Sequence, residues 1–124
     1  MIPMILNAYW KLIRFDICLA RGNFSALHAK VRNFELAPKV PSPSTVDSVC
    51  KAVDLACIWY WKEAHCLQRS AATACLLKKH GVAAQMVIGT QINPLKAHAW
   101  VEVAGCVVND KPYMREIYAV LDRC

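Results

Sequence analysis

The sequence lacks a long uncharged apolar run. A membrane-spanning helix needs about 20 predominantly apolar residues, yet Lys11, Arg14 and Asp16 already interrupt the first apolar segment of this 124-residue chain. The opening residues 1–6 also lack the basic stretch with which a secretory signal peptide begins. We therefore expect no membrane span and no signal peptide, and a location in the bacterial cytoplasm.

The cysteines lack the paired spacing of a metal site or a disulfide framework. Seven of them occur, at positions 18, 50, 57, 66, 75, 106 and 124, with no CxxC pair and no zinc-type spacing to a histidine. An odd number without regular spacing is typical of reduced thiols in a cytosolic protein, several of them acting as small buried apolar residues. We expect no metal and no cofactor.

Positive charge is concentrated in the first third of the chain. The net charge is +6, and residues 1–40 hold six Lys or Arg against Asp16 and Glu35, a net +4. Such a segment would attract an acidic partner, nucleic acid or an anionic lipid surface. The basic residues are dispersed and no nucleic-acid-binding motif accompanies them, so we do not expect nucleic acid.

The patterning predicts helices first and a small sheet afterwards. The predicted helices cover residues 3–21, 24–34, 45–63 and 66–80, and the predicted strands cover residues 82–89, 97–103 and 106–109. A loop at 91–96 joins the first two strands, and 112–121 is predicted as a short closing helix. This order indicates an α+β fold. The length suits one domain, with residues 1–43 as a basic helical lead-in and 44–124 as the core.

Cys66 is the candidate nucleophile. It begins a predicted helix, where the partial positive charge and unpaired N–H groups of the helix start favour a thiolate and can stabilise an oxyanion. Cys75 lies within the same helix and gains neither effect. The alternative is that Cys66 is a structural thiol.

His98 is the candidate general base. Strand alternation places His98 and Trp100 on one face, between small alanines, where a neutral imidazole could accept a proton from a thiol. His65 is adjacent to Cys66, but consecutive residues at a helix start point in different directions, and burial or a capping role suits it better. His98 could also be a partly buried strand residue without a catalytic role.

Asp110 is the candidate group that orients His98. It follows the third predicted strand, which pairs with the His98 strand across a tight hairpin, so it can reach the imidazole nitrogen remote from sulfur. Turn and helix-cap chemistry explains the same residue. Glu102 is the alternative carboxylate. Arg69 and Trp100 are candidate substrate contacts. The alternatives are that Arg69 only forms an ion pair and that Trp100 only packs in the core.

Five separated motifs resemble the lasso peptide leader peptidases of the transglutaminase-like cysteine protease superfamily. They are Cys66–Ser70 (CLQRS), Leu76–Ala84 (LLKKHGVAA), Val87–Gly89 (VIG), His98–Glu102 (HAWVE) and Val107–Asp110 (VVND). The resemblance implies a transglutaminase-like, papain-like core with a triad of Cys66, His98 and Asp110. It also implies cleavage of a ribosomal precursor peptide where leader and core meet, typically after a leader that ends in Thr-x.

The resemblance implies partners as well. Fused members of the family carry a PqqD-like leader-recognition domain, for which this chain has no space, so we expect the split (B2) form with a separate leader-binding B1 protein. A distinct ATP-dependent cyclase would then close the macrolactam ring. Two alternatives remain open at this point: a transglutaminase-like acyl transferase, and a non-catalytic binding subunit of a peptide-maturation complex.

Overall fold

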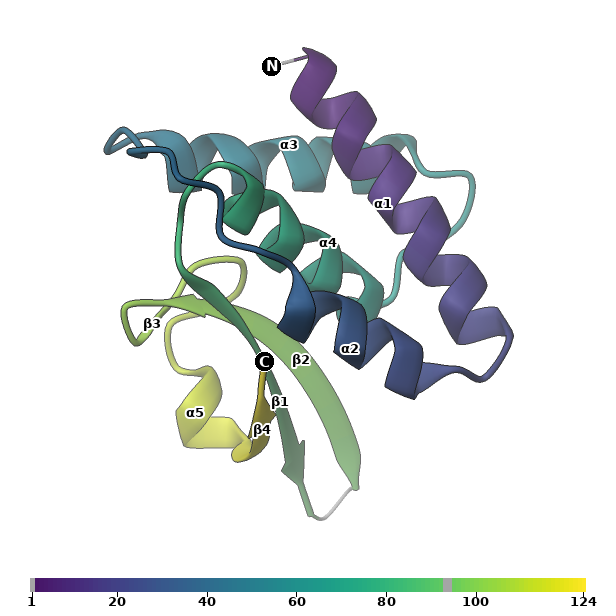
Figure 1. The fold of residues 1–124 in the computed structure, drawn as a ribbon. Helices are drawn as coiled ribbons and strands as arrows, with labels where there is room; N and C mark the ends of the chain where they lie inside the picture. The colour runs from purple at the N-terminus through teal and green to yellow at the C-terminus, as the bar shows by residue number, and fades with distance from the viewer. Residues whose placement is uncertain (1, 93–94) are drawn as a thin grey trace.

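Four helices precede the sheet in the computed structural model, which describes residues 2–92 and 95–124 (Figure 1). They are α1 (Ile2–Ala20), α2 (Phe24–Asn33), α3 (Thr45–Trp59) and α4 (Cys66–Lys79). All four predicted helices are confirmed, but α3 ends at Trp59 rather than at 63. There Tyr60 turns inward, where its hydroxyl donates a hydrogen bond to buried Asp16 at 2.8 Å. This long-range contact, which helical periodicity does not register, ends α3 early.

Gly81 ends α4 as the sequence predicts. Its φ of +85° lies in the left-handed region that favours glycine. The Gly81 amide donates to the Lys78 carbonyl and the Val82 amide to the Leu77 carbonyl, the bond pair of a Schellman motif. A Cβ on Gly81 would lie 2.3 Å from the Lys39 carbonyl oxygen, so the close approach of the proline-rich connector requires glycine as well.

The sheet has four antiparallel strands in the order β3-β2-β1-β4. They are β1 (Ala84–Gln91), β2 (Lys96–Val103), β3 (Cys106–Val107) and β4 (Ala119–Arg123). The three predicted strands are confirmed with shifted ends. The predicted loop 91–96 includes 93–94, which lie outside the described residues. The helix predicted over 112–121 is wrong in its second half: only α5 (Met114–Ile117) is helical, and β4 pairs with the free edge of β1.

The helices cover one face of the sheet, with α4 beneath α1 and α3, while α5 lies on the other side (Figure 1). The main core contains fully buried residues from both parts of the chain, including Leu12, Leu27, Val53, Leu77 and Met86. Residues 1–43 therefore contribute to the same core as the later residues. A smaller cluster of Val87, Trp100 and Met114 lies beneath α5. The fold is α+β, as predicted.

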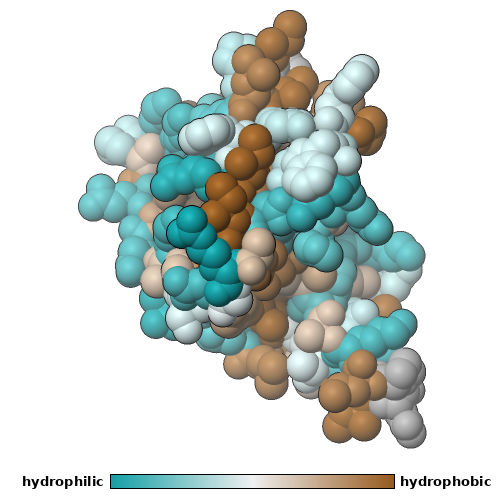
Figure 2. Space-filling view, turned by 90° about the vertical axis from the view of Figure 1, so that its right-hand side faces the viewer, coloured by the Kyte–Doolittle hydropathy of each residue, from teal (hydrophilic) through white to brown (hydrophobic). Residues whose placement is uncertain are grey.

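The outer side of α1 keeps apolar side chains in solvent. Leu6 and Trp10 are 65% and 60% exposed, and Ile2 and Ile17 are also exposed. Figure 2 looks onto the side of the molecule that lies at the right in Figure 1 and shows apolar and hydrophilic residues next to one another there. Within the described part of the chain, no helix is long and apolar enough to cross a membrane.

Candidate active site

The first turn of α4 holds Cys66 at a fixed place. His65 is the N-cap residue, as its predicted capping role requires, and its amide donates to the side-chain oxygen of Gln68 at 3.2 Å. The other end of the fully buried Gln68 amide donates to the Leu12 carbonyl of α1 at 2.7 Å. Cys66 is the first residue of the helix and is half-buried, so its thiol lies beside the unpaired N–H groups of the first turn.

His98 lies on β2, directly opposite Gly89 of β1. Its ring stacks on Trp100 and on Tyr118, with ring centroids 6.1 and 5.3 Å away and planes 28° apart in each pair. A Cβ on Gly89 would lie 2.7 Å from the Trp100 ring and 2.9 Å from Tyr118. The absence of a side chain at Gly89 is therefore what allows this aromatic stack to form and to fix the imidazole plane.

Asp110 forms a hydrogen bond with His98. The Nε2 atom of His98 lies 2.6 Å from Oδ2 of Asp110, and the other carboxylate oxygen accepts the Lys111 amide at 2.8 Å. Burial alone would raise the pKa of Asp110, but the hydrogen bonds from His98 and Lys111 outweigh burial and hold that pKa below its usual value. An ionised Asp110 holds the proton on Nε2 and leaves Nδ1 as the proton-accepting nitrogen of His98.

A hydrogen-bond network joins α4 to the segment that carries Asp110. The Ser70 hydroxyl on α4 donates to the Ala99 carbonyl at 3.1 Å and accepts from the side-chain Nδ2 of Asn109 at 3.2 Å. The Asn109 side-chain oxygen accepts the Val101 amide at 2.7 Å. Asn109 therefore fixes the residue next to it, Asp110, against both β2 and α4. Sequence reasoning missed Asn109, Ser70 and Tyr118; the position of Asn109 beside a candidate triad residue was the one available signal.

The two candidate substrate contacts have structural partners. Arg69 forms an ion pair with Asp54 at 3.1 Å and donates to the Asn109 carbonyl at 2.9 Å. Its side chain remains 37% exposed, so substrate contact stays a prediction. Trp100 is fully buried and therefore has no surface with which to touch a peptide. The predicted contact between Trp100 and substrate is therefore wrong, and the Trp100 ring packs against His98 instead.

Glu102 belongs to a different network. It is 2% exposed and accepts hydrogen bonds from the Trp100 indole and from Arg123, each at 2.8 Å. Burial acts to raise the pKa of Glu102, but Arg123 and Trp100 outweigh it and lower that pKa. Its carboxylate thus anchors the indole and β4, while Asp110 is the carboxylate that meets the imidazole.

Cys66 and His98 line the same two hollows. One, of about 360 Å³, has apolar walls formed with Phe24, Leu67 and Ile88. The other, of about 20 Å³, is also lined by Arg69, Ser70, Asn109 and Asp110, so Cys66, His98 and Asp110 border the same small space. The arrangement offers a nucleophile, a base oriented by a carboxylate, and space for an apolar group beside them.

Burial raises the pKa of four of the other six thiols. All seven cysteines are free. Burial raises the pKa of Cys50 and of Cys75 to about 11, and it also raises the pKa of Cys57 and Cys124. These four thiols stay protonated at neutral pH and are poor nucleophiles. Among the described residues, no three His, Cys, Asp or Glu side chains are grouped so as to hold a metal ion.

The chain is similar over most of its length to the transglutaminase-like proteins. The family model of the transglutaminase-like superfamily matches residues 9–123, and the chain belongs to this superfamily. A segment of 56 residues is 41% identical to the microcin J25-processing protein McjB of Escherichia coli. The match covers 45% of this chain and 27% of that relative, so the chain spans about a quarter of the relative's length. No solved structure matches significantly.

Proposed function

We propose that the protein is a cysteine peptidase that removes the leader peptide from a lasso peptide precursor in the bacterial cytoplasm. The observation that carries the proposal is the bond of 2.6 Å between His98 and Asp110 at a hollow that Cys66 also lines. The similarity to a microcin-processing protein supports a peptide as the substrate. The peptidase reading rests on these two independent lines.

The proposed reaction uses one proton carrier and two acyl transfers. Nδ1 of His98 accepts the proton of the Cys66 thiol, and the thiolate attacks the scissile carbonyl carbon. First-turn N–H groups of α4 stabilise the oxyanion. The bond to the core peptide breaks, its amine leaves with the proton from His98, and the leader remains as a thioester on sulfur. Water, deprotonated by His98, then hydrolyses the thioester to a free leader carboxylate and regenerates the thiol.

Asp110 has a positioning role in this scheme. Its carboxylate keeps the proton on Nε2 and stabilises the imidazolium that forms when His98 takes the thiol proton. Arg69 supports the segment that carries Asp110 through the Asn109 carbonyl. The apolar hollow beside Cys66, with Phe24, Leu67 and Ile88, is where a substrate side chain close to the scissile bond would lie.

The proposal includes two partners. A separate PqqD-like leader-binding protein presents the precursor, and an ATP-dependent cyclase closes the ring of the released core. No metal or organic cofactor takes part in the steps above, since the thiol and imidazole supply the nucleophile and the proton transfers.

The test is cleavage of the precursor, followed by mass spectrometry with the leader-binding protein present. We expect Cys66→Ala to abolish cleavage, while Cys106→Ala, which removes an exposed thiol outside the site, leaves it unchanged. Full activity of Cys66→Ala would sink the assignment. Product masses separate the two acyl chemistries: a gain of water indicates a peptidase, and an added amine indicates an acyl transferase. An inactive parent protein would favour a non-catalytic binding subunit.

A further inference from the structure

Two hollows lie next to each other between α1 and α2, away from Cys66. The first, of about 340 Å³, is lined by Lys11, Arg14, Lys30 and two aromatic rings. The second, of about 290 Å³, is lined by Arg14, Arg21 and Lys30 together with Ile17, Cys18, Asn23 and Ala26. Arg14 and Lys30 line both hollows, so the two are neighbours, and together we call them the α1–α2 groove.

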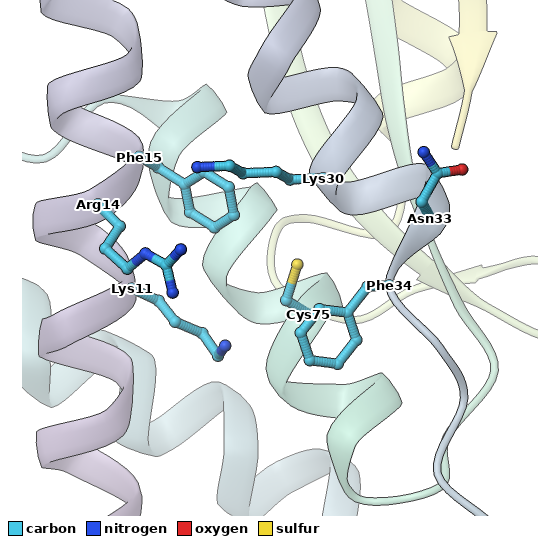
Figure 3. Close-up of a pocket in the computed structure, with 7 residues that line it drawn as sticks. All are labelled: Lys11, Arg14, Phe15, Lys30, Asn33, Phe34 and Cys75. Carbon is cyan, nitrogen blue, oxygen red and sulfur yellow. The ribbon is translucent and has the colours of Figure 1, made fainter.

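The cationic groups point into this groove. Figure 3 shows the side chains of Lys11 and Arg14 extending from α1 and that of Lys30 extending from α2 toward the space between the helices. Neither hollow has an acidic residue in its lining. Within residues 2–92 and 95–124, no carboxylate forms an ion pair with Lys11, Arg14, Arg21 or Lys30.

The acidic residue of α1 does not neutralise these cations. Asp16 is buried and is held by the Tyr60 hydroxyl at 2.8 Å and by Lys62 at 2.9 Å. Burial lowers the pKa of Lys11, and the neighbouring positive charges of Lys79 and Arg14 lower it further. The groove is therefore a place where like charges are held together without a counter-charge, and an anion that enters it gains from all of them.

The first hollow combines charge with an apolar wall. Nζ of Lys11 lies 4.9 Å from the centroid of the Phe34 ring, and Phe15 closes the wall at 5% exposure. A small inorganic anion would leave this wall uncovered. A nucleic acid base has little ring surface to stack on, because Phe15 is nearly buried and the Lys11 ammonium already lies over the face of Phe34. A carboxylate attached to an apolar side chain, as in a peptide, satisfies both parts of the hollow.

We propose that the α1–α2 groove binds an acidic peptide segment, with carboxylates at Arg14 and Lys30 and an adjacent apolar side chain in the hollow walled by Phe15 and Phe34. The groove offers room for more than one residue of a peptide, since it consists of two hollows that share Arg14 and Lys30. The proposal goes beyond the peptidase reaction and does not depend on it, because none of the groove residues lines the hollows at Cys66.

The test uses the full chain carrying Cys66→Ala, so that binding is measured without cleavage. Two fluorescein-labelled peptides serve as probes in fluorescence anisotropy: Gly-Glu-Phe-Glu-Leu-Glu-Gly and its neutral counterpart, Gly-Gln-Phe-Gln-Leu-Gln-Gly. We expect the acidic peptide to bind at least about tenfold more tightly, because its carboxylates meet cations that have no carboxylate partner among the described residues. Its affinity should fall when NaCl is raised, because Arg14, Arg21 and Lys30 are solvent-exposed and salt screens them.

Matched variants locate the binding site. Arg14→Gln combined with Lys30→Gln should weaken the acidic peptide about tenfold, whereas Lys51→Gln combined with Lys96→Gln removes the same charge elsewhere and should change binding less than about twofold. All four side chains are exposed, so both double variants are expected to fold; their circular dichroism spectra check this.

Three outcomes would overturn the proposal. If the acidic and the neutral peptide bind with equal affinity, the groove has no anion site. If both double variants lose the same affinity for the acidic peptide, the net charge of the protein, and not the groove, attracts it. Displacement of the acidic peptide by an equal concentration of single-stranded DNA, or by inorganic phosphate, would assign the groove to another anion. None of these results bears on whether Cys66 cleaves a precursor, so failure here is distinguishable from failure of the proposed function.

Discussion

Cys66 and Cys75 lie on the same helix in contrasting surroundings. Cys66 begins α4, is half-buried, and shares a hollow with His98 and Asp110. Cys75 is 1% exposed, lies at the base of the α1–α2 groove, and has a pKa that burial raises to about 11 even though Lys11 and Lys78 act to lower it. Nearby cations thus do not bring the pKa of Cys75 down to its usual value, and the two cysteines differ in their position on the helix, in their exposure and in the histidine that lines the hollow at Cys66.

The largest losses of cleavage rate should come from substitutions of His98 and Asp110, which line the hollow at Cys66 but not the one at Cys75. Asp110→Asn and His98→Ala should each lower the cleavage rate by about 10²–10⁴-fold, because the first loses control of the imidazole tautomer and the second loses the base. Rates are measured by mass spectrometry, with Asp47→Asn, which changes an exposed carboxylate in the first turn of α3, as the control. An unchanged rate in Asp110→Asn would return that residue to a turn role.

Alkylation separates the two thiols directly. At pH 7, iodoacetamide should modify Cys66 at least about 100-fold faster than Cys75, since only the thiolate reacts and the thiol of Cys75 stays protonated and buried. Peptide mapping after timed quenching gives both rates in one sample. In denaturant the two rates should converge, and His98→Ala should slow only Cys66. Comparable alkylation rates of Cys66 and Cys75 in the folded protein would contradict the proposed difference in reactivity.

Gly89→Ala tests the support of the site rather than its chemistry. A Cβ at Gly89 would meet Trp100 at 2.7 Å and Tyr118 at 2.9 Å, so the stack on His98 must shift. Overpacking of this kind costs about 1–3 kcal/mol of unfolding free energy, which urea denaturation measures. Gly22→Ala is the comparison, because nothing lies within 4 Å of its Cβ and only its positive φ is strained. A smaller loss at Gly89 than at Gly22 would contradict the packing argument.

The smallest expected effect is the acid dependence of Asp110. Its folded-state pKa is lowered, so its stabilising contribution is present above the unfolded pKa of about 3.9 and is lost as the pH falls through the folded value. Asp110→Asn should therefore be less stable than the parent at pH 7, by about 1 kcal/mol or less since the pair is partly exposed. The two stabilities should approach each other in strong acid. If the two proteins differ in unfolding free energy by the same amount at every pH, the variant has lost only the hydrogen bond from the Lys111 amide in the turn.

Local signals in the sequence predicted most of the helical layer. Apolar periodicity and end signals located α1, α2 and α4, and the predicted end of α4 at residue 80 lies one residue beyond its observed end at Lys79. They failed where distant contacts decide the structure. Residues 119–123 form β4 because β1 offers them a free edge, with a register shift between Ile88 and Gly89, and nothing within that segment records this pairing.

The same division applies to the candidate site. Cys66, His98 and Asp110 could be chosen from the sequence because each has a local context, namely a helix start, a strand face and a strand end. Tyr118 could not be chosen, since its ring reaches His98 only after β4 has paired with β1. Asn109 and Ser70 act through each other across 39 residues of chain, a separation that no local pattern reveals.

The amide of Gln68 has a consequence for the first helix. Its two ends connect the turn that begins at Cys66 to the Leu12 carbonyl, adjacent to Lys11. If α1 were removed, the Gln68 side-chain N–H would lose this acceptor and the helix that packs on α4. The first helix thus holds in place the turn that begins with the proposed nucleophile: a shortened chain starting after α1 would keep Cys66, His98 and Asp110 but lose the hydrogen bond that fixes this turn.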